Sequence, residues 1–299
     1  MDEMPPKFSV SVLITNYNTW QLSLLSAQKC VEVDGDNLEE ILVYDDGSTV
    51  PQTEEFPSRV RLYRASENLG LTKALNCAFR MPESDVIVLF DSDAYPLAPF
   101  VEELRRMFAA DEHLGLVAFP TVGRKGQRTE SYTTEPNLWS LLLGQALFAR
   151  LEKLLADRSG RISVFTCAMA IRRKTFEAVG GFDPNFDWLD LDHDLSMKVN
   201  RSEWTIVVGK KLKAFHEGGG TPQLTSKRVL RFYKTRWYLL RKFGKVPAPW
   251  LVKALILLRL RVELTVLQLL GRRFYADAAT HEDKLKGRRD LIEYCRENY

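Results

Sequence analysis

Two carboxylates separated by one residue follow the apolar run VIVLF: these are Asp91 and Asp93, with Ser92 between them. The run has the composition of a buried strand, so both side chains are expected where that strand ends. There they can face one divalent cation that prefers oxygen ligands. In isolation, a D-x-D sequence more often caps a helix or a turn. The metal interpretation therefore depends on the surrounding segments.

Two further segments carry groups that suit a nucleotide. Asp45 and Asp46 end the run ILVYD, and the Gly-Ser turn after them leaves a carboxylate that can accept a hydrogen bond from a donor such as N3 of a pyrimidine. Residues 67–70, ENLG, followed by Lys73, predict a loop that enters a helix. Backbone N–H groups and an ammonium can meet a diphosphate there. Taken singly, these segments also suit an ordinary Asx-turn and a capped helix.

A second acidic cluster and one histidine complete the candidate chemistry. Asp190, Asp192 and Asp194 alternate within LDLDHDLSMKV, which in isolation suits an acidic helix N-terminus stabilised by the macrodipole. His216 follows the strand-like WTIVVGKKL and precedes Gly218 to Gly220. An imidazole nitrogen suits Mn²⁺ better than an all-oxygen set does, and the glycines allow backbone to approach a phosphate closely. A lone histidine is more often a surface residue, so this assignment depends on its neighbours.

The elements that must position these residues alternate between short apolar runs and helical stretches from Phe8 to Asp93. The runs are nearly continuous in Val, Ile, Leu and Phe, which indicates parallel strands buried on both faces. Predicted strands cover residues 8–15, 40–45, 60–65 and 86–91. We therefore predict an α/β fold with an open, mostly parallel nucleotide-binding sheet flanked by helices. Ligands bind such sheets at the carboxyl ends of the strands, where the segments 15–18, 45–48 and 91–93 fall.

The rest of the chain is less regular. A strand is predicted over 114–122, a helix over 138–157 and a strand over 162–173. Three C-terminal helices are predicted over 226–243, 249–270 and 284–299.

In this order, the segments resemble family 2 glycosyltransferases of the glycosyltransferase A-type fold, most closely the bacterial rhamnosyltransferase-like members. VSVLITNYN resembles the first strand and donor loop, ILVYDDGST the nucleoside-binding segment, and ENLGLTKALN the helix start. VIVLFDSD resembles the metal motif, and LDLDHDLSMKV the segment that bears the catalytic base. The resemblance covers roughly residues 8–245.

The resemblance implies an inverting, metal-dependent hexosyltransferase in which Asp192 is the catalytic base. Asp91, Asp93 and His216 would hold Mn²⁺ or Mg²⁺. The implied donor-binding residues are Thr15, Tyr17, Asn18, Asp45, Asn68, Gly70, Lys73, Asp91, Ser92 and Asp93, with Asp45 on the nucleobase, and the acceptor side has Trp188 and Asp190. The chain departs from the family at Leu191, where a Glu is common. When residues 194–196 are aligned with the family segment, Asp192 rather than Asp190 falls at the position of the catalytic base.

The resemblance also implies the substrates. The donor would be a dTDP- or UDP-sugar, with dTDP-rhamnose as the specific candidate, and the acceptor a hydroxyl of a glycan or of a polyprenyl-linked glycan. Two alternatives stay open. A sugar-phosphate nucleotidyltransferase normally opens with a Gly-rich G-x-G loop, whereas the first strand here ends in TNYN. The second alternative is a non-catalytic scaffold that binds a nucleotide or glycan.

Composition and charge bound the remaining possibilities. The chain has 299 residues, of which 45% are hydrophobic and 27% charged, as in ordinary globular proteins. Residues 1–221 carry a net charge of −8, and residues 222–299 carry +11. We therefore predict a catalytic domain over 1–221, with a donor half to about residue 120 and an acceptor half from 121, and a basic helical extension over 222–299. The basic extension is expected to attract anions.

The segment from Trp250 to Leu270 is apolar but interrupted by charges such as Arg259 and Glu263, so it is not predicted to span a membrane. It suits an interfacial helix on an anionic membrane surface, or a core or homo-oligomer interface helix. Arg236, in a partial Q-x-x-R-W match, is a candidate diphosphate contact. No nucleic-acid reader motif is recognisable. The absence of a signal-peptide pattern and the four scattered cysteines favour a cytoplasmic protein. The interfacial alternative for residues 250–270 would make it peripheral on the inner face of the cytoplasmic membrane.

Overall fold

The structure, a computed structural model, describes residues 8–217, 225–274 and 277–299. The chain forms two compact units. The first unit takes residues 1–135 and 160–220, and the second unit takes 136–159 and 221–299. Residues 136–159, which the sequence placed in the N-terminal domain, therefore belong with the C-terminal helices.

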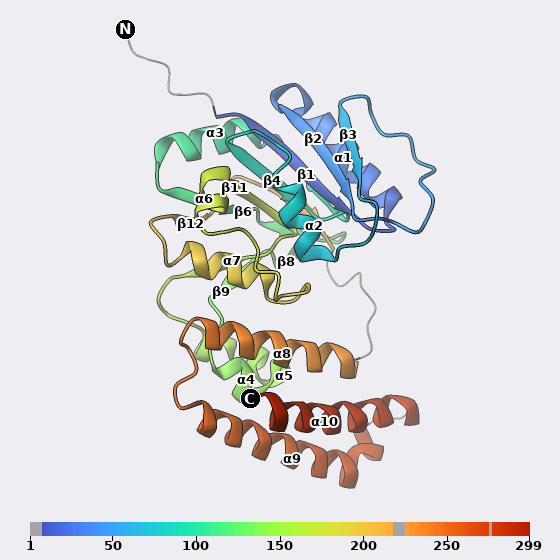
Figure 1. The fold of residues 1–299 in the computed structure, drawn as a ribbon, viewed down its shortest axis with the longest axis vertical. Helices are drawn as coiled ribbons and strands as arrows, with labels where there is room; N and C mark the ends of the chain where they lie inside the picture. The colour runs from blue at the N-terminus through green and yellow to red at the C-terminus, as the bar shows by residue number, and fades with distance from the viewer. Residues whose placement is uncertain (1–7, 218–224, 275–276) are drawn as a thin grey trace. The chain divides into compact units, whose positions relative to one another are not determined.

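A seven-stranded sheet lies at the centre of the first unit, in the order β12-β6-β11-β4-β1-β2-β3 (Figure 1). Its strands are β1 (Val10–Asn16), β2 (Glu40–Asp45), β3 (Val60–Arg64), β4 (Val86–Phe90), β6 (Leu114–Ala118), β11 (Ala168–Arg172) and β12 (Thr205–Val208). β11 runs antiparallel to β4 and β6, whereas the other pairings are parallel. The interior strand β4 is buried along its whole length, as its unbroken VIVLF composition predicts.

Helices cover the sheet and complete its core. They are α1 (Trp20–Asp34), the short 3-10 helix η1 (Gly35–Asn37), α2 (Leu71–Ala78), α3 (Val101–Ala110), α6 (Arg173–Ala178) and α7 (Leu191–Val199). Phe90 of β4 meets the edges of Phe100 and Phe119 at centroid distances of 6.2 and 5.6 Å, a geometry that aromatic pairs favour. The predicted α/β fold with a sheet flanked by helices is confirmed.

Two small sheets extend from this core. One has the order β5-β13-β7-β8, and the other pairs β9 with β10. Their strands are β5 (Ala94–Pro96), β7 (Thr121–Val122), β8 (Arg128–Thr129), β9 (Tyr132–Thr134), β10 (Ile162–Val164) and β13 (Ala214–His216). The single strand predicted over 162–173 was wrong, because its halves β10 and β11 pair with different sheets.

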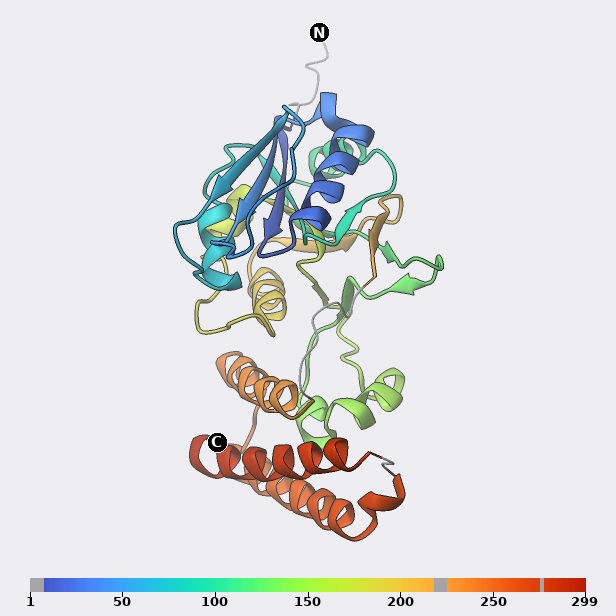
Figure 2. The same ribbon diagram turned by 90° about the vertical axis from the view of Figure 1, so that its right-hand side faces the viewer.

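The second unit is helical, with α4 (Trp139–Leu143), α5 (Gln145–Leu155), α8 (Thr225–Lys242), α9 (Pro249–Phe274) and α10 (Ala278–Asn298). Figure 2 shows α9 and α10 side by side. The predicted C-terminal helical extension is confirmed, whereas the helix predicted over 138–157 breaks at Gly144, whose φ of 77° is left-handed. Across the described residues, no helix has the length and apolar character needed to cross a bilayer.

Aromatic packing and buried polar contacts hold the second unit together. The ring of Tyr299 stacks on that of Trp237 with 3.8 Å between centroids, and its hydroxyl donates to the Tyr233 carbonyl at 2.7 Å. Arg236 is buried, lies over the ring of Phe232 and donates to Ser140 Oγ at 3.2 Å. Its predicted contact with a diphosphate stays a prediction.

Candidate active site

The carboxyl edge of the large sheet gathers three polar residues in one row. The register pairs Asn16 of β1 with Asp45 of β2, and Asp45 with Arg64 of β3. Asp45 is completely buried, and its carboxylate accepts from Asn16 Nδ2 at 2.7 Å and from the Ser48 N–H at 3.1 Å. Arg64 Nε lies 3.3 Å from Asp45 Oδ2. Asp45 therefore fixes the positions of its neighbours, and its predicted contact with a nucleobase stays a prediction.

The loop after β2 is joined to the loop that opens α2. The Asp46 carboxylate accepts from the backbone N–H of Leu69 at 2.8 Å and of Gly70 at 3.0 Å. Burial raises the pKa of Asp46, while these two donors oppose the shift. Gly47 has a φ of 66°, and a Cβ there would lie 2.4 Å from the Glu67 carbonyl carbon, so only glycine allows this approach. The structure thus brings two predicted donor segments together.

The remaining predicted donor residues lie in or after strands β1 and β4, or near the start of α2. Asn18 has a φ of 58°, and its side-chain oxygen accepts from the Val50 N–H at 2.9 Å, so it ties the loop after β1 to the loop after β2. Asn68 donates to the Asp46 carbonyl at 3.2 Å. Tyr17 and Lys73 are exposed, and Thr15 and Ser92 are half-buried. Each of these four residues is at least partly accessible to solvent, and its role in donor binding stays a prediction.

The predicted metal ligands form a cluster. Carboxylate oxygens of Asp91 and Asp93 and a ring nitrogen of His216 all lie within 4.8 Å of one another. Pairing of β5 with β13 brings this about, because it sets His216 opposite Ala94, the residue after Asp93. The rings of Tyr95 and Phe215 stack with 4.7 Å between centroids and support the same register. The separation along the chain between Asp93 and His216 is 123 positions.

The electrostatics of this cluster fit a cation. The pKa of Asp91 is raised to about 7 by burial first, and then by the charges of Asp93 and Asp192. His216 Nε2 lies 3.6 Å from Asp93 Oδ1, and Nδ1 is buried without a hydrogen-bond partner among the described residues. Two carboxylates and an imidazole form a donor set that Mn²⁺ accepts. The predicted contribution of Gly218 to Gly220 lies outside the described residues.

The three alternating acids of α7 lie in different environments. Asp190 occupies the N-cap position with a left-handed φ of 64°, is buried, and its Oδ1 lies 3.9 Å from His193 Nε2. Asp194 is also buried, 3.2 Å from Lys198 Nζ. Asp192 is half-buried in the first helical turn, and its charge helps to raise the pKa of Asp91. Asp192 is thus the one of the three acids whose charge contributes to the raised pKa of Asp91, and its role as the catalytic base stays a prediction.

The segment before α7 carries the predicted acceptor residue Trp188, which is half-buried. Its backbone N–H donates to Asp187 Oδ1 at 2.8 Å. The Thr72 hydroxyl of α2 donates to the carbonyl of Asp187 at 2.9 Å. This segment is thereby tied to the helix that follows the donor loops.

Sequence reasoning assigned no role to several residues that shape this edge, namely Asn16, Ser48, Arg64 and Cys167. Asn16 and Ser48 lie within the predicted segments 15–18 and 45–48, and Arg64 ends its strand, so the rule that ligands bind at the carboxyl ends could have pointed to all three. Cys167 carries no such signal: its carbonyl accepts the Asp91 N–H at 3.1 Å and thereby positions the metal motif.

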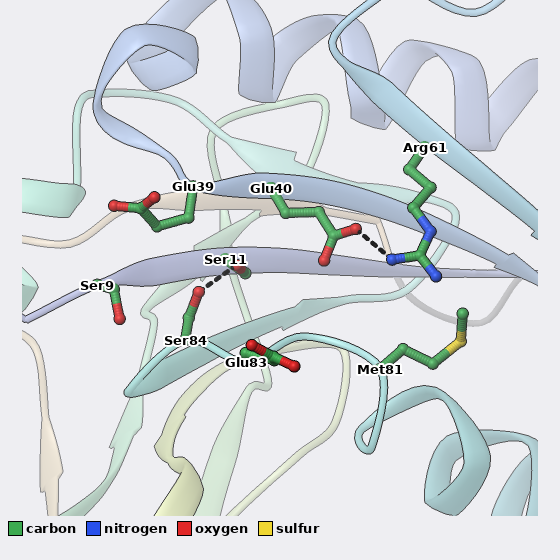
Figure 3. A pocket seen from close by; sticks show the side chains of 8 residues that line it. All are labelled: Ser9, Ser11, Glu39, Glu40, Arg61, Met81, Glu83 and Ser84. Carbon is green, nitrogen blue, oxygen red and sulfur yellow. Dashed lines mark hydrogen bonds and ion pairs between the residues drawn. The ribbon is translucent and has the colours of Figure 1, made fainter.

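A pocket of about 380 Å³ lies at the opposite edge of the sheet (Figure 3). Ser11, Glu40 and Arg61 line it from the amino ends of β1, β2 and β3, and Arg61 pairs with Glu40 at 2.9 Å. None of the predicted site residues lines this pocket. It is separate from the candidate active site.

Comparison with known proteins finds related sequences and similar folds. The family model for glycosyl transferase family 2 matches residues 11–180. Hyaluronan synthase of Streptococcus pyogenes is 32% identical over 115 residues, which is 35% of this chain and 27% of the relative, so the chain matches about a quarter of that protein's length.

Two solved structures share the fold. GalNAc-T7 with UDP, GalNAc and Mn²⁺ has a TM-score of 0.55 at 14% identity, over 78% of this chain and 50% of its own. A mannosyltransferase from Pyrobaculum calidifontis in complex with GDP-Man and Mn²⁺ has a TM-score of 0.52 at 17% identity, over 99% of this chain and 89% of its own.

Proposed function

Because the chain belongs to glycosyl transferase family 2, we propose that it moves a sugar from a nucleotide-diphosphate donor to an acceptor hydroxyl with inversion at the sugar carbon. One observation carries the proposal. Asp91, Asp93 and His216 form a cluster at the edge where nucleotides bind in sheets of this kind, and the charge of Asp192, an acid on another element, acts on Asp91. A displacement of diphosphate by an alcohol needs these two functions together.

The base and the metal site have separate chemical roles. The acceptor oxygen gains nucleophilicity when Asp192 takes its proton, which requires approach to about 2.6–3.2 Å. A new bond then forms from that oxygen to the sugar carbon while the bond from the carbon to the diphosphate oxygen breaks. Asp91, Asp93 and His216 would hold Mn²⁺ or Mg²⁺, which when bound neutralises the charge that develops on the leaving diphosphate.

The charge of the first unit supports the need for a cation. Its residues carry a net charge of −9, and three carboxylates gather at the site itself. An anionic diphosphate would meet repulsion from these groups, since like charges a few ångströms apart in a partly buried site interact strongly. A divalent cation held by Asp91 and Asp93 reverses the sign of the local charge.

The resemblance and the solved structures that share the fold guide the choice of substrates that we propose to test. We propose a pyrimidine-linked donor, dTDP- or UDP-sugar, with rhamnose as the first sugar to test. One of the two solved structures is with UDP and the other with GDP-Man, so the nucleobase is a variable of the test. The acceptor we propose is a glycan or a polyprenyl-linked glycan, reached from the cytoplasmic face of a membrane.

A panel of nucleotide-sugars tests this proposal by thermal shift, each with and without Mn²⁺. A ligand that binds only the native state raises the unfolding temperature by mass action, so the true donor should do so in the presence of the metal. The same donor should lose its sugar to water or to an acceptor. Binding without turnover on any acceptor would favour a non-catalytic scaffold, and release of pyrophosphate from a nucleoside triphosphate and a sugar phosphate would favour a nucleotidyltransferase.

A further inference from the structure

Helix α9 exposes a continuous stripe of apolar side chains. The α9 stripe consists of Leu251, Leu255, Leu258, Val262, Val266 and Leu269. Consecutive members are three or four positions apart, which places them on one face of the helix. The stripe is about 27 Å long at 1.5 Å per residue. Leu258 is 60% exposed and Leu269 is 77% exposed.

The helix has a second apolar face that is already used. Val252, Ile256 and Leu260 lie four positions apart and are buried. They account for the packing of α9 within its own unit, in contact with α10 and α4. The core of the second unit therefore does not use the α9 stripe. The alternative that α9 is a core helix explains only its buried face.

The charged residues that interrupt the apolar sequence of α9 make their contacts away from the α9 stripe. Lys253 donates to the carbonyl oxygens of Arg296 and Tyr299 at 2.7 and 3.0 Å. Arg259 donates to Glu263 at 2.7 Å and also to the Tyr233 hydroxyl. Tyr233 lies on α8 and Arg296 on α10, and Tyr299 directly follows α10. The side chains of Lys253 and Arg259 therefore point into the helical unit. Arg261, which is exposed at the border of the stripe, is the exception.

We propose that the α9 stripe docks on the surface of a bilayer that contains anionic lipid. Charge complementarity selects this occupant: the second unit carries a net charge of +12, so an anionic surface attracts it. The apolar stripe then enters the boundary between headgroups and acyl chains, with Arg261 at its border. Trp250, 73% exposed at the start of α9, is a side chain of the type that accumulates at this boundary.

A second copy of the chain is the alternative occupant, and the charge opposes it. In such a dimer, two copies of the second unit, each with a net charge of +12, would repel each other along their stripes. An anionic lipid surface attracts each copy. Docking on lipid does not depend on the proposed transferase activity. It places the enzyme where a polyprenyl-linked acceptor would be found.

Vesicle flotation of the full chain tests the proposal. The parent should float with vesicles of phosphatidylcholine and phosphatidylglycerol, and much less with phosphatidylcholine alone. The double variant Leu258→Gln/Leu269→Gln keeps good helix formers in place but removes two exposed apolar groups, so it should bind at least about 10-fold more weakly. The matched control, Leu22→Gln/Leu25→Gln, removes two exposed leucines from α1 of the first unit and should bind like the parent.

Three results would overturn the proposal. The first is parent protein that stays with the buffer at low salt. The second is equal flotation of the parent and the stripe variant. The third is a parent dimer, detected by analytical ultracentrifugation without vesicles, that becomes monomeric in the stripe variant, because this would make the stripe a subunit interface. Circular dichroism of each variant checks that the helices remain folded.

Discussion

The two compact units carry net charges of opposite sign, and one gathers carboxylates whereas the other exposes apolar side chains. The first unit has a net charge of −9 and gathers carboxylates at the edge of a buried sheet. The second unit has +12 and exposes leucines and valines along α9. In the function that we propose, the acidic unit needs a cation before it can hold an anionic diphosphate, whereas the net positive charge of the basic unit favours an anionic surface directly. The small net charge of the whole chain, +3, conceals this division.

The largest expected effect concerns the acid that we assign as the base. Asp192→Asn should lower the rate of transfer about 10³-fold and leave donor affinity nearly unchanged, because the base acts on the acceptor proton. Initial rates and donor titrations measure the two quantities separately. Asp190→Asn is the matched control, since asparagine also tolerates the left-handed backbone at that position. A larger loss in the control than in Asp192→Asn would move the base to Asp190.

Removal of a metal ligand should have the next largest effect. We expect Asp93→Ala and His216→Ala each to weaken donor binding in Mn²⁺ about 100-fold while binding to anionic vesicles stays unchanged, because the two units hold different ligands. Calorimetric titration with and without Mn²⁺ measures the effect. His113→Ala, at an exposed histidine of the first unit, is the control. If His216→Ala keeps the manganese dependence of the parent, its role as a ligand is wrong.

Destabilising the second unit tests whether the first can work alone. Tyr299→Ala removes a ring stacked on Trp237 and should lower the stability of the second unit by about 2–3 kcal/mol, with Mn²⁺ binding retained. Differential scanning calorimetry follows the unfolding. Tyr299→Phe loses only the hydrogen bond to the Tyr233 carbonyl and should cost about 1 kcal/mol. Loss of Mn²⁺ binding in Tyr299→Ala would show that the units depend on each other.

The smallest expected effect is a change in donor binding that distinguishes the carboxyl edge of the sheet from its amino edge. Arg64→Gln should weaken donor binding about 5-fold, because Arg64 helps to hold the buried carboxylate of Asp45. Arg61→Gln changes the same strand at its amino end, where Arg61 pairs with Glu40, and should leave donor binding unchanged. The same titrations compare the two variants. Equal losses would indicate a general weakening of β3.

The sequence predicted the sheet and the polar segments at its carboxyl edge, because buried parallel strands have a distinctive composition and their ends are marked by Asp45 and Asp91. It could not predict that Asp45 is enclosed by Asn16, Ser48 and Arg64, since this depends on the register between strands. His216 joined the metal ligands only through the family resemblance. Its place beside Asp93 depends on pairing between β5 and β13.

The sequence was less informative about the helical part. Apolar periodicity continues across Gly144, so a single helix was predicted where the left-handed glycine separates α4 from α5. For α9, composition alone could not decide which of two apolar faces is exposed. Which face is buried depends on partners far along the chain, such as the carbonyl oxygens that accept hydrogen bonds from Lys253.

The pairing of β5 with β13 also has a consequence for the order of folding. Asp93 and His216 are 123 positions apart, and closing a loop of that size costs conformational entropy before any contact forms between them. Contacts of such high sequence separation slow folding and are expected to form after the local helices and the first strand pairs. A nascent chain released before His216 would therefore retain Asp91 and Asp93 without the third ligand. Under the metal role that we propose, binding of the ion by all three residues would report that the first unit has reached its native topology.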